Sequence, residues 1–84
     1  MKEVKIYTTT YCGFCVRAKD FLRSKGVAYE EIDVTGDDAM RAQLVEMSGG
    51  CKTVPQVFIG GQPVGGYTDL VQLEREGKLD PMLQ

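Results

Sequence analysis

The order in which short strand and helix patterns follow one another constrains the fold of this chain more than any other feature. Strand patterns lie at residues 3–7, at residues 27–34 and on both sides of Gly60-Gly61. Helix patterns lie at residues 12–25, at about 38–48 and from Thr68 to Gly77. A strand-helix-strand start predicts a right-handed parallel crossover, whereas strands around two glycines predict an antiparallel hairpin. We therefore expect an α/β fold with a mixed four-stranded sheet flanked by helices.

The second helix pattern predicts both a cap and a buried face. Asp37 or Asp38 is expected to accept hydrogen bonds from the first free amides. Met40, Leu44 and Met47 recur at intervals of four and three, which is the spacing of one helix face. We interpret the two methionines as core packing rather than as metal ligands.

The C-terminal third carries an edge-strand signal and a helix start. Pro63 cannot donate a ladder hydrogen bond, so the second hairpin strand is expected at the edge of the sheet. Thr68 precedes the apolar positions Leu70 and Leu73 and is the expected N-cap of the last helix. The tail after Gly77 predicts at most a final turn.

Length and composition indicate one small soluble domain over residues 1–84. The chain has 84 residues, of which 43% are hydrophobic and 26% charged, and its formal net charge is -2. Neither nucleic acid nor an anionic membrane is indicated as a partner. The N-terminus lacks the apolar run of a signal peptide, and no segment approaches the roughly 20 apolar residues of a membrane span. The expected location is the reducing cytoplasm.

The chain has three cysteines, and two of them lie three residues apart in "TYCGFC" at residues 10–15. Small secreted domains built on disulfides have four or more cysteines, so a disulfide scaffold is not favoured. A zinc site is not favoured either, because the chain has no histidine and Cys51 has no near cysteine partner. A pair of reactive thiols remains as the interpretation, with a metal cluster shared between two chains still open.

The position of the pair predicts different roles for Cys12 and Cys15. The pair begins a helix, where unpaired amides and the helix dipole favour a thiolate over a thiol. Cys12 lies at the outer edge and is the expected nucleophile, since the thiolate is the form that attacks disulfides. Cys15 lies nearly one turn further on, can reach the Cys12 sulfur and is the expected resolving thiol.

"TVPQVFI" at residues 53–59 is a second signal. Pro55 directly precedes a buried strand pattern, where a proline often accompanies a special backbone turn. We hypothesise a cis bond between Val54 and Pro55, although the local sequence alone also fits a trans proline that leads the strand.

Three motifs together resemble a glutaredoxin, a family of the thioredoxin-fold superfamily: "CGFC", "TVPQVFIGGQ" and "GGYTDL". The resemblance covers nearly the whole chain and implies a thioredoxin-like fold with a cis Val-Pro bond. It further implies that the backbone of Thr53 and Val54 pairs with the cysteinyl part of glutathione, with Pro55 against the active thiol. The segment that would receive the γ-glutamyl end consists of Gly66, Tyr67, Thr68 and Asp69.

Three departures from the family pattern affect the expected site. Gly13 and Phe14 replace the usual proline and tyrosine, so Phe14 keeps an aromatic wall but lacks a hydroxyl. Thr9 takes the place of a lysine that would pair with the glycyl carboxylate of glutathione. Gln56 and Lys52 are candidates for part of that contact.

Gly13-Phe14 also matches the motif of monothiol glutaredoxins, which bind a [2Fe-2S] cluster between two subunits. A glutathione-bridged dimer with Cys12 as cluster ligand is therefore a hypothesis for this chain, although Cys15 is retained. Cys51 is interpreted as a spare, semi-buried thiol, with regulatory glutathionylation as the other interpretation.

Residues and resemblance together predict a glutathione-dependent thiol-disulfide oxidoreductase. It would reduce protein disulfides and protein-glutathione mixed disulfides as a monomer, with glutathione as reductant and no bound cofactor. The resemblance implies ribonucleotide reductase as one type of client protein. Two alternatives remain: a carrier of a glutathione-bridged [2Fe-2S] cluster, and a redoxin reduced by thioredoxin reductase.

Overall fold

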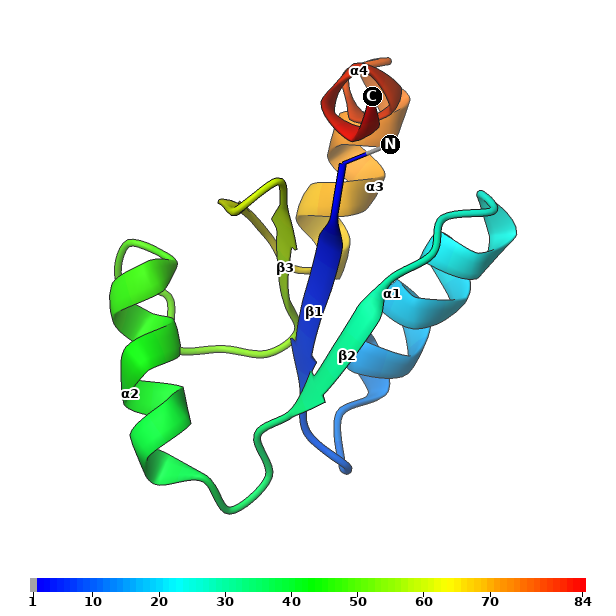
Figure 1. Cartoon of the computed structure of the whole chain (residues 1–84). Helices are drawn as coiled ribbons and strands as arrows, with labels where there is room; N and C mark the ends of the chain where they lie inside the picture. Colours follow the sequence, from blue (N-terminus) through cyan, green and yellow to red (C-terminus); the bar gives the residue numbers. More distant parts are fainter. Residues whose placement is uncertain (1) are drawn as a thin grey trace.

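The computed structural model describes residues 2–84 and contains one mixed sheet between two layers of helices (Figure 1). In chain order the elements are β1 (Val4–Thr8), α1 (Gly13–Ser24), β2 (Glu30–Asp33), α2 (Asp38–Met47), β3 (Gln56–Ile59), β4 (Gln62–Gly65), α3 (Tyr67–Arg75) and α4 (Leu79–Leu83). The strand order in the sheet is β2-β1-β3-β4. β1 pairs parallel with β2 and antiparallel with β3, which forms the hairpin with β4. The predicted fold class is confirmed.

Side-chain alternation along the strands divides the core between the two faces of the sheet. Val4 and Ile6 of β1 pack with α1, α3 and α4, in a cluster that includes Leu22 and Leu70. Tyr7 of β1 and Phe58 of β3 point to the opposite face, where they pack with Leu44 of α2, as well as with Val34. The helices α1, α3 and α4 therefore cover one face, and α2 stands apart on the other (Figure 1).

The hairpin and the second helix form as the sequence predicts. Gly60 and Gly61 connect β3 to β4 with φ angles of 59° and 84°, a conformation that glycine adopts without strain. Pro63 lies in β4 at the edge of the sheet. Asp37 caps α2, because its carboxylate accepts a hydrogen bond from the Met40 amide at 3.0 Å.

Four details differ from the prediction. The second strand is shorter than residues 27–34, because the Val27 amide donates to the Leu22 carbonyl and completes the turn after α1 instead of joining the sheet. Met47 is 44% exposed, since Leu44 fills the buried position of α2. Thr68 is not an N-cap: α3 begins one residue earlier, and Gly66 is its cap residue. The tail forms α4 rather than a single turn.

A search of residues 2–84 for a helix of sufficient length and apolar character to cross a membrane finds none.

Candidate active site

The two cysteines of the "CGFC" motif lie at the first turn of α1, as the sequence predicts. Cys12 is the N-cap residue, and its Sγ accepts a hydrogen bond from the Cys15 amide at 3.1 Å. No acidic side chain lies in the first turn of the helix. The helix dipole and the donated N–H both stabilise negative charge on sulfur, so this position suits a thiolate.

Cys15 has a different environment. Its side chain is only 1% exposed, and burial raises the pKa of its thiol to about 12. The hydrogen bond and the charge of Cys12 raise that pKa further, whereas the Thr9 amide lowers it. Cys15 therefore keeps its proton at neutral pH, and the half-buried Cys12 is the member of the pair placed to attack.

The peptide bond between Val54 and Pro55 is cis, which confirms the hypothesis from the sequence. Pro55 is buried, and the preceding carbonyl approaches the reactive cysteine: the Cys12 thiol donates to the Val54 oxygen at 3.5 Å. The loop before β3 and the start of α1 therefore meet at the Cys12 sulfur.

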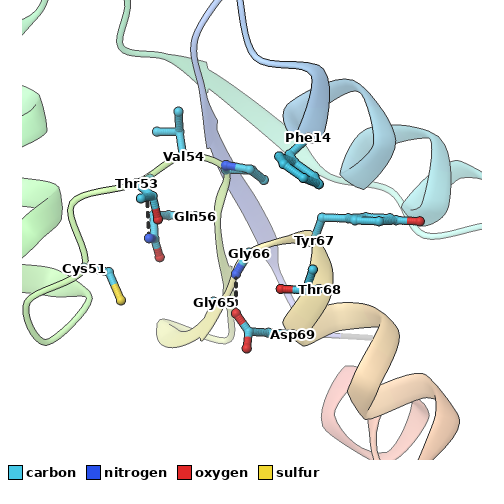
Figure 2. Close-up of a pocket in the computed structure, with 11 residues that line it drawn as sticks. Phe14, Cys51, Thr53, Val54, Gln56, Gly65, Gly66, Tyr67, Thr68 and Asp69 are labelled. Carbon is cyan, nitrogen blue, oxygen red and sulfur yellow. Dashed lines mark hydrogen bonds between the residues drawn. The ribbon is translucent and has the colours of Figure 1, made fainter.

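A groove of about 310 Å³ extends from this point along the C-terminal side of the loop (Figure 2). Three separate segments line it, namely the start of α1, the loop that leads into β3 and the start of α3. Its lining residues are Phe14, Cys51, Thr53, Val54, Pro55, Gln56, Gly65, Gly66, Tyr67, Thr68 and Asp69. The fold thus brings together all but one of the residues predicted to bind glutathione. The exception is Thr9, which lies outside this lining and whose amide contacts Cys15 instead.

Phe14 and Tyr67 form an aromatic wall at one side of the groove (Figure 2). Their ring centroids are 6.3 Å apart, and the rings are tilted by 32°. Phe14 is 52% exposed, and the Arg17 guanidinium lies 5.4 Å from its centroid on the outer side. Large apolar surface at this position is therefore available to a ligand.

The start of α3 offers amide donors and one carboxylate to the groove. The Asp69 carboxylate accepts from the Gly66 amide at 2.9 Å and so closes the first turn of the helix. Gly65 precedes this turn with a φ of 117°, and a Cβ there would stand 2.7 Å from Asp69 Cγ. The sequence analysis missed Gly65, although the "GG" before "YTD" is the signal that could have found it.

Gln56 lies beneath the loop and is 2% exposed. Its Nε2 donates to the Thr53 carbonyl at 2.7 Å, whereas Oε1 has no hydrogen-bond partner among residues 2–84. A contact with the glycyl carboxylate, as predicted from the sequence, would need a free donor, but the unpartnered atom of Gln56 is an acceptor. Lys52, the other candidate, is exposed, and its carbonyl accepts from Arg41 at 3.4 Å.

Cys51 is exposed and lines the groove, so its prediction as a semi-buried thiol is wrong. It follows the two glycines that end α2, and its amide donates to the Ser48 hydroxyl at 3.2 Å. This hydrogen bond holds the loop close to the end of the helix and leaves the side chain at the surface.

Comparison with known proteins agrees with this geometry. The family model for glutaredoxin matches residues 4–64. A glutaredoxin of Pseudomonas aeruginosa is 49% identical over 83 residues, which are 99% of this chain and 98% of the relative. Glutaredoxin 3 of Escherichia coli K12 is 45% identical over 84 residues, with both chains covered completely.

Solved structures show the same relationship. The glutaredoxin-glutathione complex from buckwheat superposes with a TM-score of 0.89 at 38% identity, and the match covers 98% of this chain and 76% of the buckwheat chain. The solution structure of a Brucella melitensis glutaredoxin gives a TM-score of 0.86 at 48% identity, covering 99% and 89% of the two chains. The chain therefore belongs to the glutaredoxin family of thiol-disulfide oxidoreductases.

Proposed function

We propose that this glutaredoxin is a dithiol enzyme that uses glutathione to reduce protein disulfides and protein-glutathione mixed disulfides. The observation that carries the proposal is the position of the Cys12 sulfur, at a helix N-terminus and 3.5 Å from the Val54 carbonyl at one end of the groove. The buckwheat relative, whose structure is a complex with glutathione, supports the choice of ligand.

The first step in this proposal is attack of the Cys12 thiolate on a substrate disulfide. The bond between the two substrate sulfurs breaks, Cys12 forms a mixed disulfide, and the leaving thiolate takes up a proton. Glutathione then displaces the substrate part, or Cys15 does so after losing its proton to a base. Because burial keeps Cys15 protonated, we expect displacement by glutathione to suffice for small substrates.

The groove provides matching groups for each part of glutathione. The extended backbone of Thr53 and Val54 can pair with the cysteinyl unit while its sulfur meets Cys12. The N-terminus of α3 would hold the γ-glutamyl carboxylate, and Asp69 its ammonium group. Phe14 and Tyr67 would cover the apolar part of the ligand.

We further propose a cytoplasmic monomer acting on disulfide-containing or glutathionylated proteins, with ribonucleotide reductase as one class of client. The cluster-carrier alternative depends on Cys12, because residues 2–84 contain no group of three or more side chains that could hold a metal. A cluster would need thiolates from outside one chain.

The test is reduction of a small glutathione mixed disulfide, coupled to NADPH through glutathione reductase. Wild type and Cys15→Ser should turn over, whereas Cys12→Ser should be inactive. An inactive wild type would refute the proposal, and two further measurements would then separate the alternatives. Reduction by thioredoxin reductase would indicate the other redoxin class, and a coloured dimer after anaerobic reconstitution with iron, sulfide and glutathione would indicate a cluster carrier.

A further inference from the structure

Cys51 is a third thiol that the proposed redox cycle does not use, yet it lies in the same groove. The side chain is exposed and lines the groove beside Thr53 and Gln56. Figure 2 shows Cys51 and the Gln56 amide at the same end of the groove, on the side away from Phe14 and Tyr67. A molecule that occupies this end of the groove therefore meets a sulfur and an amide oxygen together.

The Gln56 oxygen is an independent sign that this end of the groove takes a ligand. Buried polar atoms nearly always have a hydrogen-bond partner, and leaving one without costs about 1–3 kcal/mol. Gln56 is 98% buried by the complement of its 2% exposure, and its Oε1 has no partner among residues 2–84. Because the Thr53 carbonyl fixes the amide nitrogen on one side, the oxygen must point the other way, into the groove. An N–H donor on a ligand would satisfy it.

We propose that Cys51 is a modification site, which takes up a short cysteine-containing peptide of the glutathione type as a mixed disulfide. A peptide N–H of the bound unit would donate to Gln56 Oε1. The oxidant is the disulfide form of the same peptide: the Cys51 thiolate attacks one of its sulfurs, and the bond between the two peptide sulfurs breaks. A bond between Cys51 and that sulfur forms, and the other peptide leaves as a thiolate that takes up a proton.

The consequence is inhibition under oxidising conditions, and this part rests on the proposed function. A peptide linked to Cys51 would lie in the groove in which substrates of Cys12 are proposed to bind. Modification of a thiol outside the catalytic pair would therefore close the site while leaving Cys12 and Cys15 reduced. Reduction by free glutathione would reverse it.

The main experiment uses Cys12→Ser/Cys15→Ser, in which Cys51 is the only thiol. The rate of addition from glutathione disulfide is followed by intact-mass spectrometry and divided by the rate with 4,4′-dithiodipyridine, which measures intrinsic thiol reactivity. The control replaces Cys51 by serine as well and adds Ser24→Cys, an exposed position at the end of α1. We expect the normalised rate at Cys51 to exceed the control by about threefold to tenfold, the effect of one good hydrogen bond.

Two further arms distinguish guidance by the groove from simple exposure. S-methylglutathione cannot form a disulfide, so by filling the groove it should slow addition at Cys51 and leave the control unchanged. Gln56→Met in the same background should bring the normalised rate down toward the control. Equal normalised rates at the two thiols, or no effect of S-methylglutathione, would overturn the proposal whether or not the Gln56 variant folds.

The inhibitory consequence is tested separately with active enzyme. Wild type treated with glutathione disulfide and then freed of glutathione on Cys12 by brief reduction should lose turnover in proportion to the adduct left on Cys51. Cys51→Ser should keep its own untreated rate through the same treatment. Full activity in wild type that carries the adduct would refute inhibition, while an inactive untreated wild type would count against the proposed function and leave the mass measurements to decide the modification.

Discussion

The two cysteines of the active motif have the same chemistry and opposite surroundings. Cys12 ends the loop and accepts the Cys15 amide at its sulfur, whereas Cys15 points into the protein and is 1% exposed. A helix start places one residue outside the first turn and brings the residue three further on back toward the sheet. The division of roles follows from this geometry rather than from the residue type.

We expect alkylation to distinguish the two thiols. Because the pKa of Cys15 is raised to about 12, its thiol stays protonated, and so unreactive, at every pH well below that value. In a reduced Cys51→Ser variant, iodoacetamide between pH 7 and 9 should add one label, on Cys12. Peptide mapping by mass spectrometry would check this. Rapid labelling of Cys15 in the folded protein would contradict the assigned roles, and labelling of both thiols in urea is the control.

Gly65 should be the glycine of the groove that least tolerates a side chain. Gly65 and Gly61 both have positive φ, so alanine at either is strained by about 1 kcal/mol or more. Only at Gly65 would the new Cβ also meet the Asp69 carboxylate, which must then leave the Gly66 amide. We expect Gly65→Ala to destabilise the protein by about 1–2 kcal/mol more than Gly61→Ala, with the lost cap as the cause. Urea unfolding measures both, and equal losses would show that the contact does not matter.

At the scale of elements, Glu31 of β2 joins three neighbours across one face of the sheet. Its Oε2 accepts from the Thr8 hydroxyl of β1 at 2.8 Å and from Lys19 Nζ of α1 at 3.0 Å. Thr8 is 1% exposed, so this hydrogen bond satisfies a buried hydroxyl. The parallel pair and the crossover helix are thus connected by polar contacts as well as by their apolar core.

The contribution of Glu31 should depend on pH in a defined direction. Lys19 and then Thr8 hold the pKa of this carboxyl below its ordinary value of 4.5. Its stabilisation is therefore fully present above the unfolded pKa and is lost as the pH falls through the lower folded pKa. Glu31→Gln should cost about 0.5–1 kcal/mol at pH 7 and almost nothing at pH 3. Urea unfolding across this range tests it, with the exposed Glu30→Gln as control; a cost that does not change with pH would contradict the sign.

Patterns within single elements predicted the fold, because they report local physics. Alternation in β1 and the glycine pair of the hairpin each specify one element and its neighbour. The extent of β2 could not be read in this way, since the Val27 amide is taken by a helix carbonyl that the strand pattern does not reveal. The exposure of Met47 depends on how α2 meets the sheet, which is a tertiary property.

The site was predictable where a motif names its residues and not where a rotamer decides. The three motifs gave Cys12, Val54 and Asp69, which the fold brings to one groove or its end. The unpartnered oxygen of Gln56 results from a hydrogen bond to Thr53, and the exposure of Cys51 results from the loop after α2. Neither depends on a residue pattern, so neither could be derived from the sequence.

At the scale of the whole molecule, the C-terminal helix completes the core on the face that carries the active site. Leu79 and Leu83 of α4 are 0% and 4% exposed and pack with the cluster that includes Ile6 and Leu22. Lys25, at the end of α1, bonds to Glu74 of α3 at 2.7 Å and to Asp80 of α4 at 2.8 Å. The Lys2 amide also donates to the Leu83 carbonyl, so the start and the end of the described chain are tied together.

Truncation of Leu79 should therefore destabilise the whole protein although the residue touches no part of the groove. Leu79→Ala removes a fully buried side chain and should cost about 2–5 kcal/mol, a large part of the about 5–10 kcal/mol available to a domain of this length. Met82→Ala, in the same helix but half-buried, should cost clearly less. Thermal and urea unfolding measure both variants, and turnover per folded molecule should stay unchanged in each because the groove residues keep their supports in α1, β3 and α3. A loss at Leu79 no larger than at Met82 would mean that α4 is an appendage rather than a part of the core.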